Sequence, residues 1–384
     1  MNACDPVGAL RQLVAFDTTS RNSNLALIEW IAGQAEHAGA AVRYTRSDDG
    51  RKANALISLG PVDVPGIVLS GHTDVVPVDN QPWESDPFTV TMRDGRLYGR
   101  GVTDMKSFSA CGLAFVPEFV RRGVAKPLHF ALSYDEEVGC IGVRRLIADI
   151  VARGVRPAAC IVGEPTGMEL VVAHKGKKAW RCRVRGFEAH SSLTPSGVNA
   201  VQIACEIVAY IARRAREFRD AGKRDDAYDV PYTTAHVGTI RGGTALNIVP
   251  RDCTFDFEIR HLPFDDPDLF IRDVQQFAAG FLAAMHAVDA GTYIEFDHLS
   301  TLPGFDTHDG SDVTALGHAC NATDDVGKVS FGTEASLFHG ASIPTIICGP
   351  GHIAQAHQPN EWVSLDQIAR CEAFMQRLVD RLAA

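Results

Sequence analysis

Short apolar runs separated by polar turns recur along this chain of 384 residues, and they alternate with longer segments of helical spacing. Runs of this kind are typical of buried strands. The clearest four lie at 67–70, 128–133, 159–162 and 345–348. Helical spacing at 108–121 and 143–152 falls between such runs. The alternation predicts an α/β fold with βαβ units and a mixed, mostly parallel sheet flanked by helices.

Both ends of the chain carry further segments of helical spacing. The segments 7–16 and 25–38 are predicted to open the α/β domain, and those at 309–318 and 365–382 to close it around a strand at 343–348. We therefore expect the two ends of the chain to fold into the same domain.

The pattern changes after residue 177, where apolar residues begin to alternate with basic ones. Strand, helix, strand, strand, helix and strand are predicted at 179–185, 200–218, 232–240, 253–260, 267–287 and 292–296. This order is that of a ferredoxin-like α+β domain. The sequence thus predicts a first domain in two parts, 1–177 and 297–384, with a second domain, 178–296, inserted into it.

Composition excludes several classes of protein. The net charge of −10 and the acidic isoelectric point argue against a nucleic-acid partner. No apolar run approaches the roughly 18 residues of a membrane span, so we expect no membrane partner. The first residues lack the basic and apolar segments of a signal peptide. This predicts a cytoplasmic protein whose ten cysteines form no disulfide framework.

Side chains that can bind a metal stand where the predicted strands end. The candidates, in chain order, are His72, Asp74, Asp104, Glu136, Glu137, Glu164 and His357. All but Asp104 follow one of the apolar runs, and Asp104 follows a glycine-rich stretch. Open α/β sheets bind ligands at the carboxyl ends of their strands. Two histidines with several carboxylates suit two divalent cations, since one ion would not need so many ligands.

Taken one at a time, these residues have simpler explanations. An aspartate such as Asp104 or Asp74 is common in turns and helix caps, and a histidine after a glycine is often structural. Glu164 precedes a proline and could be an ordinary loop acid, and Glu136 and Glu137 could belong to a solvated acidic loop. Only the whole set favours a metal site.

Four segments resemble, in order, the motifs of the M20 metallopeptidase family. They are SGHTDVVP at 70–77, GRGVTDMK at 99–106, DEEVG at 135–139 and GEPT at 163–166. Within that family, GTEA at 332–335, GPG at 349–351 and AHQPNE at 356–361 resemble the acetylornithine deacetylase branch. The resemblance spans nearly the whole chain. It implies a zinc-exopeptidase-like catalytic domain with an inserted dimerisation domain, or lid.

The resemblance also implies two zinc ions, for which cobalt could substitute because it suits the same ligands. His72 and Glu164 would hold one ion, and Glu137 and His357 the other. Asp104 would bridge the two. This assignment makes physical sense, because a carboxylate between two cations neutralises charge on both.

Catalytic roles beside the ions are implied for three further residues. Asp74 would orient His72 and raise its basicity. Glu136 would be the general base, taking a proton from the attacking water and delivering it to the leaving amine. His190, in the inserted domain, would reach the active site of a partner subunit and stabilise the oxyanion. That role requires a homodimer formed through the inserted domain, and the simpler alternative is a surface or capping histidine.

Substrate-binding residues are implied in both domains. Asn247 and Arg260 would bind the substrate carboxylate, for which the planar guanidinium is well suited, although Arg260 could instead form a surface ion pair. Gly332 and Thr333 would line the pocket through backbone groups. Glu334 could accept the δ-ammonium of ornithine, or it could be an ordinary acid at a helix start.

The expected partner is therefore a small N-acyl amino acid, and the expected reaction is hydrolysis of N-acetyl-L-ornithine to L-ornithine and acetate. Succinyl-diaminopimelate, acetylcitrulline, a dipeptide or an acylated glutamate are alternative substrates for the same chemistry. The GTEA segment at 332–335 favours ornithine, since the desuccinylases usually carry serine-aspartate-glycine there. A catalytically silent metal-binding protein is the alternative of another class.

Overall fold

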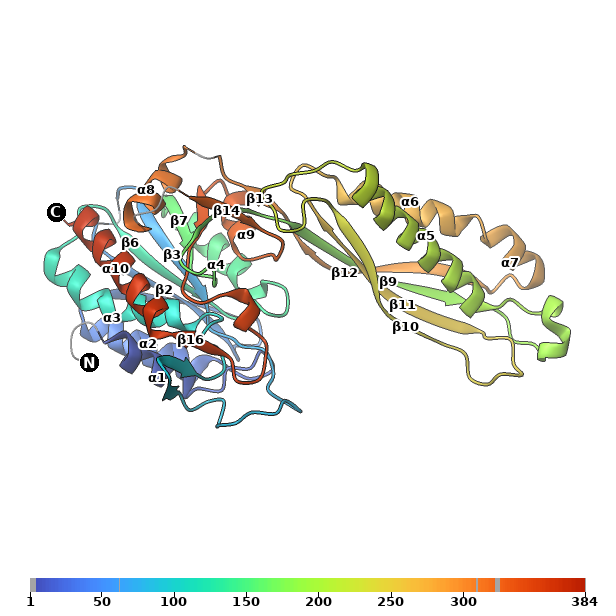
Figure 1. The fold of residues 1–384 in the computed structure, drawn as a ribbon, viewed down its shortest axis with the longest axis horizontal. Helices are drawn as coiled ribbons and strands as arrows, with labels where there is room; N and C mark the ends of the chain where they lie inside the picture. The colour runs from blue at the N-terminus through green and yellow to red at the C-terminus, as the bar shows by residue number, and fades with distance from the viewer. Residues whose placement is uncertain (1–4, 62, 309, 322–324, 384) are drawn as a thin grey trace. The chain divides into compact units, whose positions relative to one another are not determined.

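The computed structural model describes residues 5–61, 63–308, 310–321 and 325–383. The chain folds into two compact units (Figure 1). Unit 1 comprises Met1–Ala173, Phe305–Lys328 and Thr333–Ala384, and unit 2 comprises His174–Gly304 and Val329–Gly332. The predicted functional boundaries after residues 177 and 296 stay a prediction, and the second of them falls inside a strand of unit 2.

A mixed sheet forms the centre of unit 1. Its strands lie in the order β1 (Ala41–Arg46), β2 (Ala53–Leu59), β6 (Leu128–Ser133), β3 (Gly66–His72), β7 (Pro157–Val162), β15 (Thr345–Ile347), β8 (Leu170–His174) and β13 (Phe305–Asp306), with β14 (Val326–Val329) paired to β8. The central strands β6, β3, β7 and β15 are parallel, while β1, β2 and β8 pair antiparallel with their neighbours. The predicted α/β class is confirmed.

Helices cover the sheet of unit 1 (Figure 1). They are α1 (Pro6–Val14), α2 (Leu25–His37), α3 (Lys106–Arg122), α4 (Ile141–Ala152), α8 (Asp312–Asn321), α9 (Ala335–Gly340) and α10 (Leu365–Leu382). Alternate strand residues such as Leu69 and Phe130 join Phe108 of α3 in one large core, as the period of two along a strand requires. The predicted start of one helix, residue 309, lies outside the described residues. None of the described helices has the length and apolar character needed to cross a membrane.

A second, small sheet in unit 1 escaped the sequence analysis. Its strands lie in the order β16 (Trp362–Ser364), β5 (Arg96–Tyr98) and β4 (Thr91–Arg93). Each has three residues, which is too short to carry a detectable alternation of apolar and polar positions. This sheet ties the segment that leads to Asp104 to the segment that follows His357.

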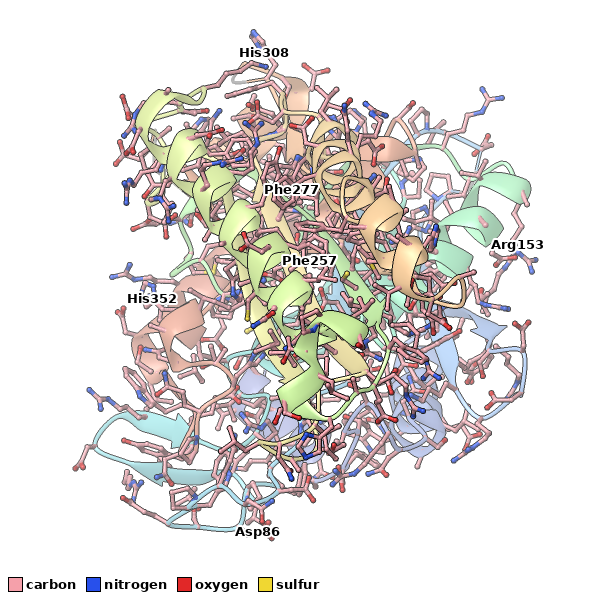
Figure 2. The ribbon with its side chains drawn as sticks, turned by 90° about the vertical axis from the view of Figure 1, so that its right-hand side faces the viewer. Asp86, Arg153, Phe257, Phe277, His308 and His352 are labelled. Atoms are coloured by element: carbon pink, nitrogen blue, oxygen red, sulfur yellow. The ribbon has the colours of Figure 1, made fainter. Side chains whose placement is uncertain are left out.

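Unit 2 has the predicted ferredoxin-like order. Its elements are β9 (Gly176–Arg185), a short 3₁₀ helix η1 (Ser191–Ser196), α5 (Ala200–Ala221), β10 (Thr234–Gly242), β11 (Asp252–His261), α6 (Pro267–Ala279), α7 (Leu282–Val288) and β12 (Tyr293–Leu302). The strands pair antiparallel in the order β10, β11, β9, β12. Phe257 is buried in the core, and Phe277 packs against that core and stacks on Tyr210 (Figure 2).

Two predicted elements of unit 2 differ most in extent from the structure, while the bounds of the others differ by two or three residues at most. The helix expected at 267–287 is divided into α6 and α7 at Gly280, where the regular helix is interrupted. The strand expected to end at residue 296 continues to Leu302, because it pairs with β9 as far as Lys177. Pairing with a distant strand is a tertiary contact, and it extends a strand beyond what its own sequence pattern indicates.

Candidate metal centre

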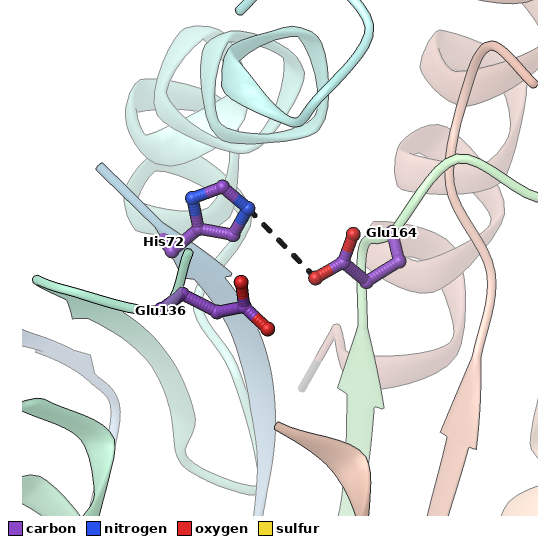
Figure 3. Close-up of side chains that lie close together, drawn as sticks. All are labelled: His72, Glu136 and Glu164. Carbon is purple, nitrogen blue, oxygen red and sulfur yellow. Dashed lines mark ion pairs between the residues drawn. The ribbon is translucent and has the colours of Figure 1, made fainter. Parts of the chain in front are cut away.

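Three adjacent parallel strands, β6, β3 and β7, end at the same edge of the sheet, and the candidate ligands lie close together there. His72 is the last residue of β3, which lies between β6 and β7. The turn that carries Glu136 and Glu137 follows β6, and Glu164 lies two residues beyond β7. Because parallel strands share the direction of their carboxyl ends, these side chains meet, as Figure 3 shows for three of them.

The first group of candidate donors consists of His72, Glu136 and Glu164. One donor atom from each lies within 4.8 Å of the other two. The His72 Nε2 atom is 3.8 Å from Glu164 Oε1, the distance marked in Figure 3. Each of the three comes from a different strand end, so the sheet itself sets their spacing.

The second group contains His72, Asp104 and Glu137, with His357 beside it. Asp104 lies between the two histidines, since Oδ1 is 2.9 Å from His72 Nε2 and Oδ2 is 3.2 Å from His357 Nε2. His357 Nε2 is also 3.1 Å from Glu137 Oε2. One carboxylate therefore reaches both histidines, one with each oxygen.

The tautomer of His72 leaves a lone pair on Nε2, the ring nitrogen that faces this cluster. Its Nδ1 lies 2.9 Å from the main-chain carbonyl oxygen of Asp74. A carbonyl only accepts hydrogen bonds, so Nδ1 carries the proton, and Nε2, which faces Asp104 and Glu164, is left for a ligand bond.

The carboxylate of Asp74 forms its hydrogen bonds with groups other than the His72 ring. It lies 3.7 Å from His72 Nδ1, beyond hydrogen-bond distance. It accepts instead from the Ser20 hydroxyl at 2.7 Å and from the backbone N–H groups of Glu136 and Glu137 at 3.0 and 3.3 Å. Asp74 thus orients the histidine through its main chain and fixes the glutamate turn through its side chain.

Burial shifts the pKa values of the clustered acids upward. Burial, reinforced by Glu137, raises the pKa of Glu136 to about 8, and burial raises the pKa of Glu164 well above its usual value. For Asp104, burial acts in the same direction, but hydrogen bonds with His357 and His72 outweigh it and lower the pKa. The hydrogen bonds to Asp104 and Glu137 raise the pKa of His357 to about 10.

This donor set fits divalent cations. Four carboxylates gathered in a buried place repel one another and are costly to ionise unless a positive charge neutralises them. In the protein alone, protons on the histidines and on the acids with raised pKa values meet that need. Metal ions would displace those protons, because ligating groups must be deprotonated. The mixture of imidazole and carboxylate donors suits zinc or cobalt.

Cys140 was missed by the sequence analysis, although it lies in the same turn as Glu136. Its Sγ donates to Glu136 Oε1 at 3.2 Å. Burial, together with the neighbouring acids, raises the pKa of the Cys140 thiol, so the group stays protonated and remains a donor. Its position four residues after Glu136, at the start of α4, was the available signal.

Glu334 and Thr333 lie in the interior of unit 1. Glu334 is 1% exposed, its Oε2 accepts from the Ser70 hydroxyl at 3.2 Å, and its Oε1 accepts from the Ser133 hydroxyl. Burial raises the pKa of Glu334 to about 7. Thr333 is fully buried and accepts from the backbone of Ala335. A contact of either residue with substrate stays a prediction.

Gly332 belongs to unit 2 and packs against Leu302 there. A Cβ atom at this position would lie 2.4 Å from Leu302 Cδ2, so a larger residue here would make the Leu302 side chain shift. This contact belongs to the packing of unit 2, and a role of Gly332 in lining a substrate pocket stays a prediction.

His190 and Asn247 are brought together at one end of the unit 2 sheet. The backbone N–H of Ser191 donates to the Asn247 carbonyl oxygen at 3.0 Å, and His190 bridges to Ile248. Both side chains are exposed, and His190 is the N-cap of η1, where its Nδ1 accepts from the Ser192 backbone N–H at 3.2 Å. The two predicted residues thus share one exposed loop cluster.

Arg260 lies at the opposite end of the same sheet. It pairs in register with Lys177 near the start of β9, whereas the His190 cluster follows the far end of β9 at Arg185, which pairs with Asp252. Eight residues of β11 separate positions 252 and 260, roughly 27 Å at the usual rise per residue. Arg260 Nε donates to Glu258 Oε1 at 3.0 Å within its own strand.

Comparison with known proteins gives matches over nearly the whole chain. The family model described as peptidase family M20/M25/M40 matches residues 68–381. The chain is 32% identical to the acetylornithine deacetylase of Pasteurella multocida over 371 residues, which cover 95% of this chain and 93% of that protein.

Two solved structures share the fold. A tripeptidase from Staphylococcus aureus matches with a TM-score of 0.79 at 18% identity, covering 98% of both chains. An M20 family metallo-carboxypeptidase from Sulfolobus solfataricus matches with a TM-score of 0.78 at 15% identity, covering 99% of both chains. The α/β fold of unit 1 and the α+β fold of unit 2 therefore recur together in the chains of other proteins.

Proposed function

This chain belongs to peptidase family M20/M25/M40, and we propose that it uses two divalent metal ions, Zn²⁺ or Co²⁺, to hydrolyse N-acetyl-L-ornithine to L-ornithine and acetate. The observation that carries the proposal is the cluster of two histidines and four carboxylates near the strand ends of unit 1, in which the His357 side chain is 49% exposed and the other histidine is buried. The choice of substrate rests on the 32% identity to an acetylornithine deacetylase over nearly the full length.

Five residues would hold the ions. His72 and Glu164 would bind one, Glu137 and His357 the other, and Asp104 would bind both, consistent with its place between the two histidines. When bound, such ions polarise an amide carbonyl and lower the pKa of water. The rest of the chemistry falls to the side chains around them.

Glu136 is the group best placed to move the proton. Its backbone is held by Asp74 and its Oε1 by Cys140, so its other oxygen is free to face the cluster. We assign it the part of general base, which accepts a proton from water and passes it to the departing amine. A general base works best when its pKa is near the working pH, and burial brings the pKa of Glu136 to about 8 before metal binds.

The separation of His190 from Arg260 supports a homodimer. An N-acyl amino acid is several times shorter than the roughly 27 Å of strand between the two ends of the unit 2 sheet. One copy of unit 2 therefore cannot present both ends to the same substrate molecule. We infer that Arg260 serves the site of its own chain, whereas His190 and Asn247 serve the site of a partner subunit.

The experiment that tests the substrate is a panel of N-acyl amino acids, assayed by release of free amine with Zn²⁺ and with Co²⁺. Acetylornithine is expected to give the highest kcat/KM. Faster turnover of succinyl-diaminopimelate, acetylcitrulline, an acylated glutamate or a dipeptide would reassign the substrate while keeping the chemistry. Tight metal binding without turnover of any member would favour a metal-binding protein that is catalytically silent.

A further inference from the structure

Two segments that carry proposed ligands, 99–104 and 357–361, meet at one buried carboxylate. Glu361 is 1% exposed. Its Oε1 accepts from the backbone N–H groups of Thr103 at 2.8 Å and Asp104 at 3.1 Å, and its Oε2 accepts from that of Gly101 at 3.1 Å. A single side chain thus holds the backbone of the loop that ends in the bridging candidate Asp104.

Arg100, in the same loop, holds the segment that carries His357. Its side chain is also 1% exposed, and one nitrogen donates to Glu361 Oε2 at 2.8 Å and to the Gln358 carbonyl oxygen at 3.3 Å. The other nitrogen donates to Gln81 Oε1 at 2.5 Å, and the Gln81 amide donates to the His357 carbonyl oxygen at 3.1 Å. Hydrogen bonds therefore fix the carbonyl groups of His357 and of the residue that follows it.

The two segments are also joined through their backbones. Gly99 N–H donates to the Glu361 carbonyl oxygen at 3.0 Å, and the Thr103 hydroxyl donates to the Trp362 carbonyl oxygen at 2.6 Å. Trp362 pairs with Tyr98 in the sheet of β16 and β5. The buried ion pair is therefore one part of a continuous set of contacts between the two segments.

We propose that Glu361 and Arg100 form a clamp that sets the distance between Asp104 and His357 before metal binds. They are positioning residues for the proposed metal centre, and the inference rests on that proposed function. Hydrogen bonds to an ionised carboxylate are stronger than neutral ones, and three backbone donors with a guanidinium satisfy both oxygens of Glu361. Glu361 consequently has no oxygen left for a metal ion, which distinguishes it from the ligand candidates.

The test compares metal affinity with stability in the variant Glu361→Gln. The amide nitrogen of glutamine must face either the backbone donors or Arg100, so at least one hydrogen bond is replaced by two opposed donors. Loss of a residue that orients metal ligands typically weakens metal binding about 10- to 100-fold. We expect a loss of that size in Zn²⁺ affinity, measured by competition with a chromophoric chelator. Excess Zn²⁺ should restore most of kcat, with KM for substrate unchanged.

Two further variants complete the test. Asp256→Asn removes an arginine–carboxylate pair of unit 2, formed with Arg181, and is the matched control whose Zn²⁺ affinity should equal that of the wild type. Arg100→Lys keeps the positive charge but loses the planar fork, and it should weaken Zn²⁺ binding several-fold. If Glu361→Gln does not fold, the Zn²⁺ affinity of Arg100→Lys still tests the clamp.

The possible outcomes distinguish failure of the clamp from failure of the proposed metal centre. If both clamp variants melt earlier without metal but bind Zn²⁺ as tightly as the wild type, Glu361 and Arg100 only stabilise the fold, and the clamp is refuted. If the wild-type protein itself binds no divalent ion, the proposed metal centre fails and the clamp fails with it. Weakened binding in both variants, with normal binding by Asp256→Asn, is the result that supports the clamp.

Discussion

The two groups of candidate site residues differ in how the protein holds them. In unit 1, His72, Asp104 and Glu164 are buried and their positions follow from strand ends and from further buried polar contacts. In unit 2, His190 and Asn247 are exposed on two loops that backbone hydrogen bonds join to each other. The first group is arranged before any ligand arrives, whereas under the proposed function the second would become part of a site only when another surface meets it.

Under the proposed function, this difference would allow one protein to combine fixed chemistry with an adjustable substrate pocket. Metal ligands have to be held at set distances, which a packed sheet provides. Groups that contact the substrate have to let it enter and leave, which exposed loops allow. The predictions below test whether the division between the two groups is real.

The largest effect is expected from removing the general base. Glu136→Gln should lower kcat about 100- to 10,000-fold, the usual contribution of general acid–base catalysis, because the proposed base can no longer accept the proton. Metal content, measured by elemental analysis, should stay at the wild-type level. A variant that loses its metal along with its activity would assign Glu136 to metal binding instead.

Mixing two inactive variants should sharpen the assignment of His190. His190→Ala should lower kcat about 100- to 1,000-fold, the usual cost of losing one oxyanion donor. If His190 acts on the partner's site, mixed dimers of His190→Ala and Glu136→Gln contain one complete site. A mixture in equal amounts that exchanges subunits should then recover about a quarter of wild-type activity.

The control for this experiment is each variant taken alone through the same exchange step, because dimers of a single variant contain no complete site. The assay should include a subunit-exchange step, verified by mixing tagged and untagged chains. If the exchanged mixture is no more active than the separate variants, His190 acts at the site of its own chain. The metal cluster of unit 1 and the His190 loop of unit 2 would then serve the same protomer.

Much of the unit 1 site could be predicted from the sequence, because its signals are local. An apolar run followed by a turn marks a strand end, and this placed His72 and Glu164 at one edge of the sheet. The order of elements in unit 2 was accessible for the same reason. Glu361 was visible in the motif at 356–361, but its partners are backbone N–H groups, which no sequence pattern identifies.

The contacts of the Asp74 carboxylate were unpredictable for a related reason. The spacing of two residues from His72 suggested a direct pair, yet the carboxylate accepts from the turn after a neighbouring strand, β6. That choice depends on how β3 and β6 pair, which is a tertiary property. The strands β4, β5 and β16 were missed because three residues are too few to display a period.

Removing metal should make the protein less stable as the pH rises. The pKa of Glu136 is raised to about 8 and that of Glu334 to about 7. The folded protein thus keeps protons that the unfolded chain releases above about pH 4.5. The pKa of His357, raised to about 10, acts in the same direction, since its stabilising charge is present below about pH 6.5 and lost as the pH approaches 10.

Melting temperatures with chelator and with Zn²⁺, recorded from pH 5.5 to 9, would measure this effect. The chelated protein should melt progressively earlier, while the gap between the two states widens, because metal ligands bind better once deprotonated. Glu334→Gln is the matched variant, and it should flatten the slope between pH 5.5 and 7. A melting temperature of the chelated protein that rises with pH would contradict the buried acids described for unit 1.

The smallest effect is expected at Cys140, which orients the base without touching the other candidate ligands. Its thiol donates one hydrogen bond to Glu136, and a typical hydrogen bond contributes about 1 kcal/mol, or roughly a 5-fold change in rate. Cys140→Ala should therefore lower kcat several-fold with KM unchanged, and Cys140→Ser, which keeps a donor, should recover most of it. Equal losses in both variants would mean that packing at this position matters, rather than the bond to Glu136. A loss confined to Cys140→Ala would mean that unit 1 also orients the proposed base, Glu136, before a ligand binds. Glu136 would then differ in this respect from the exposed His190.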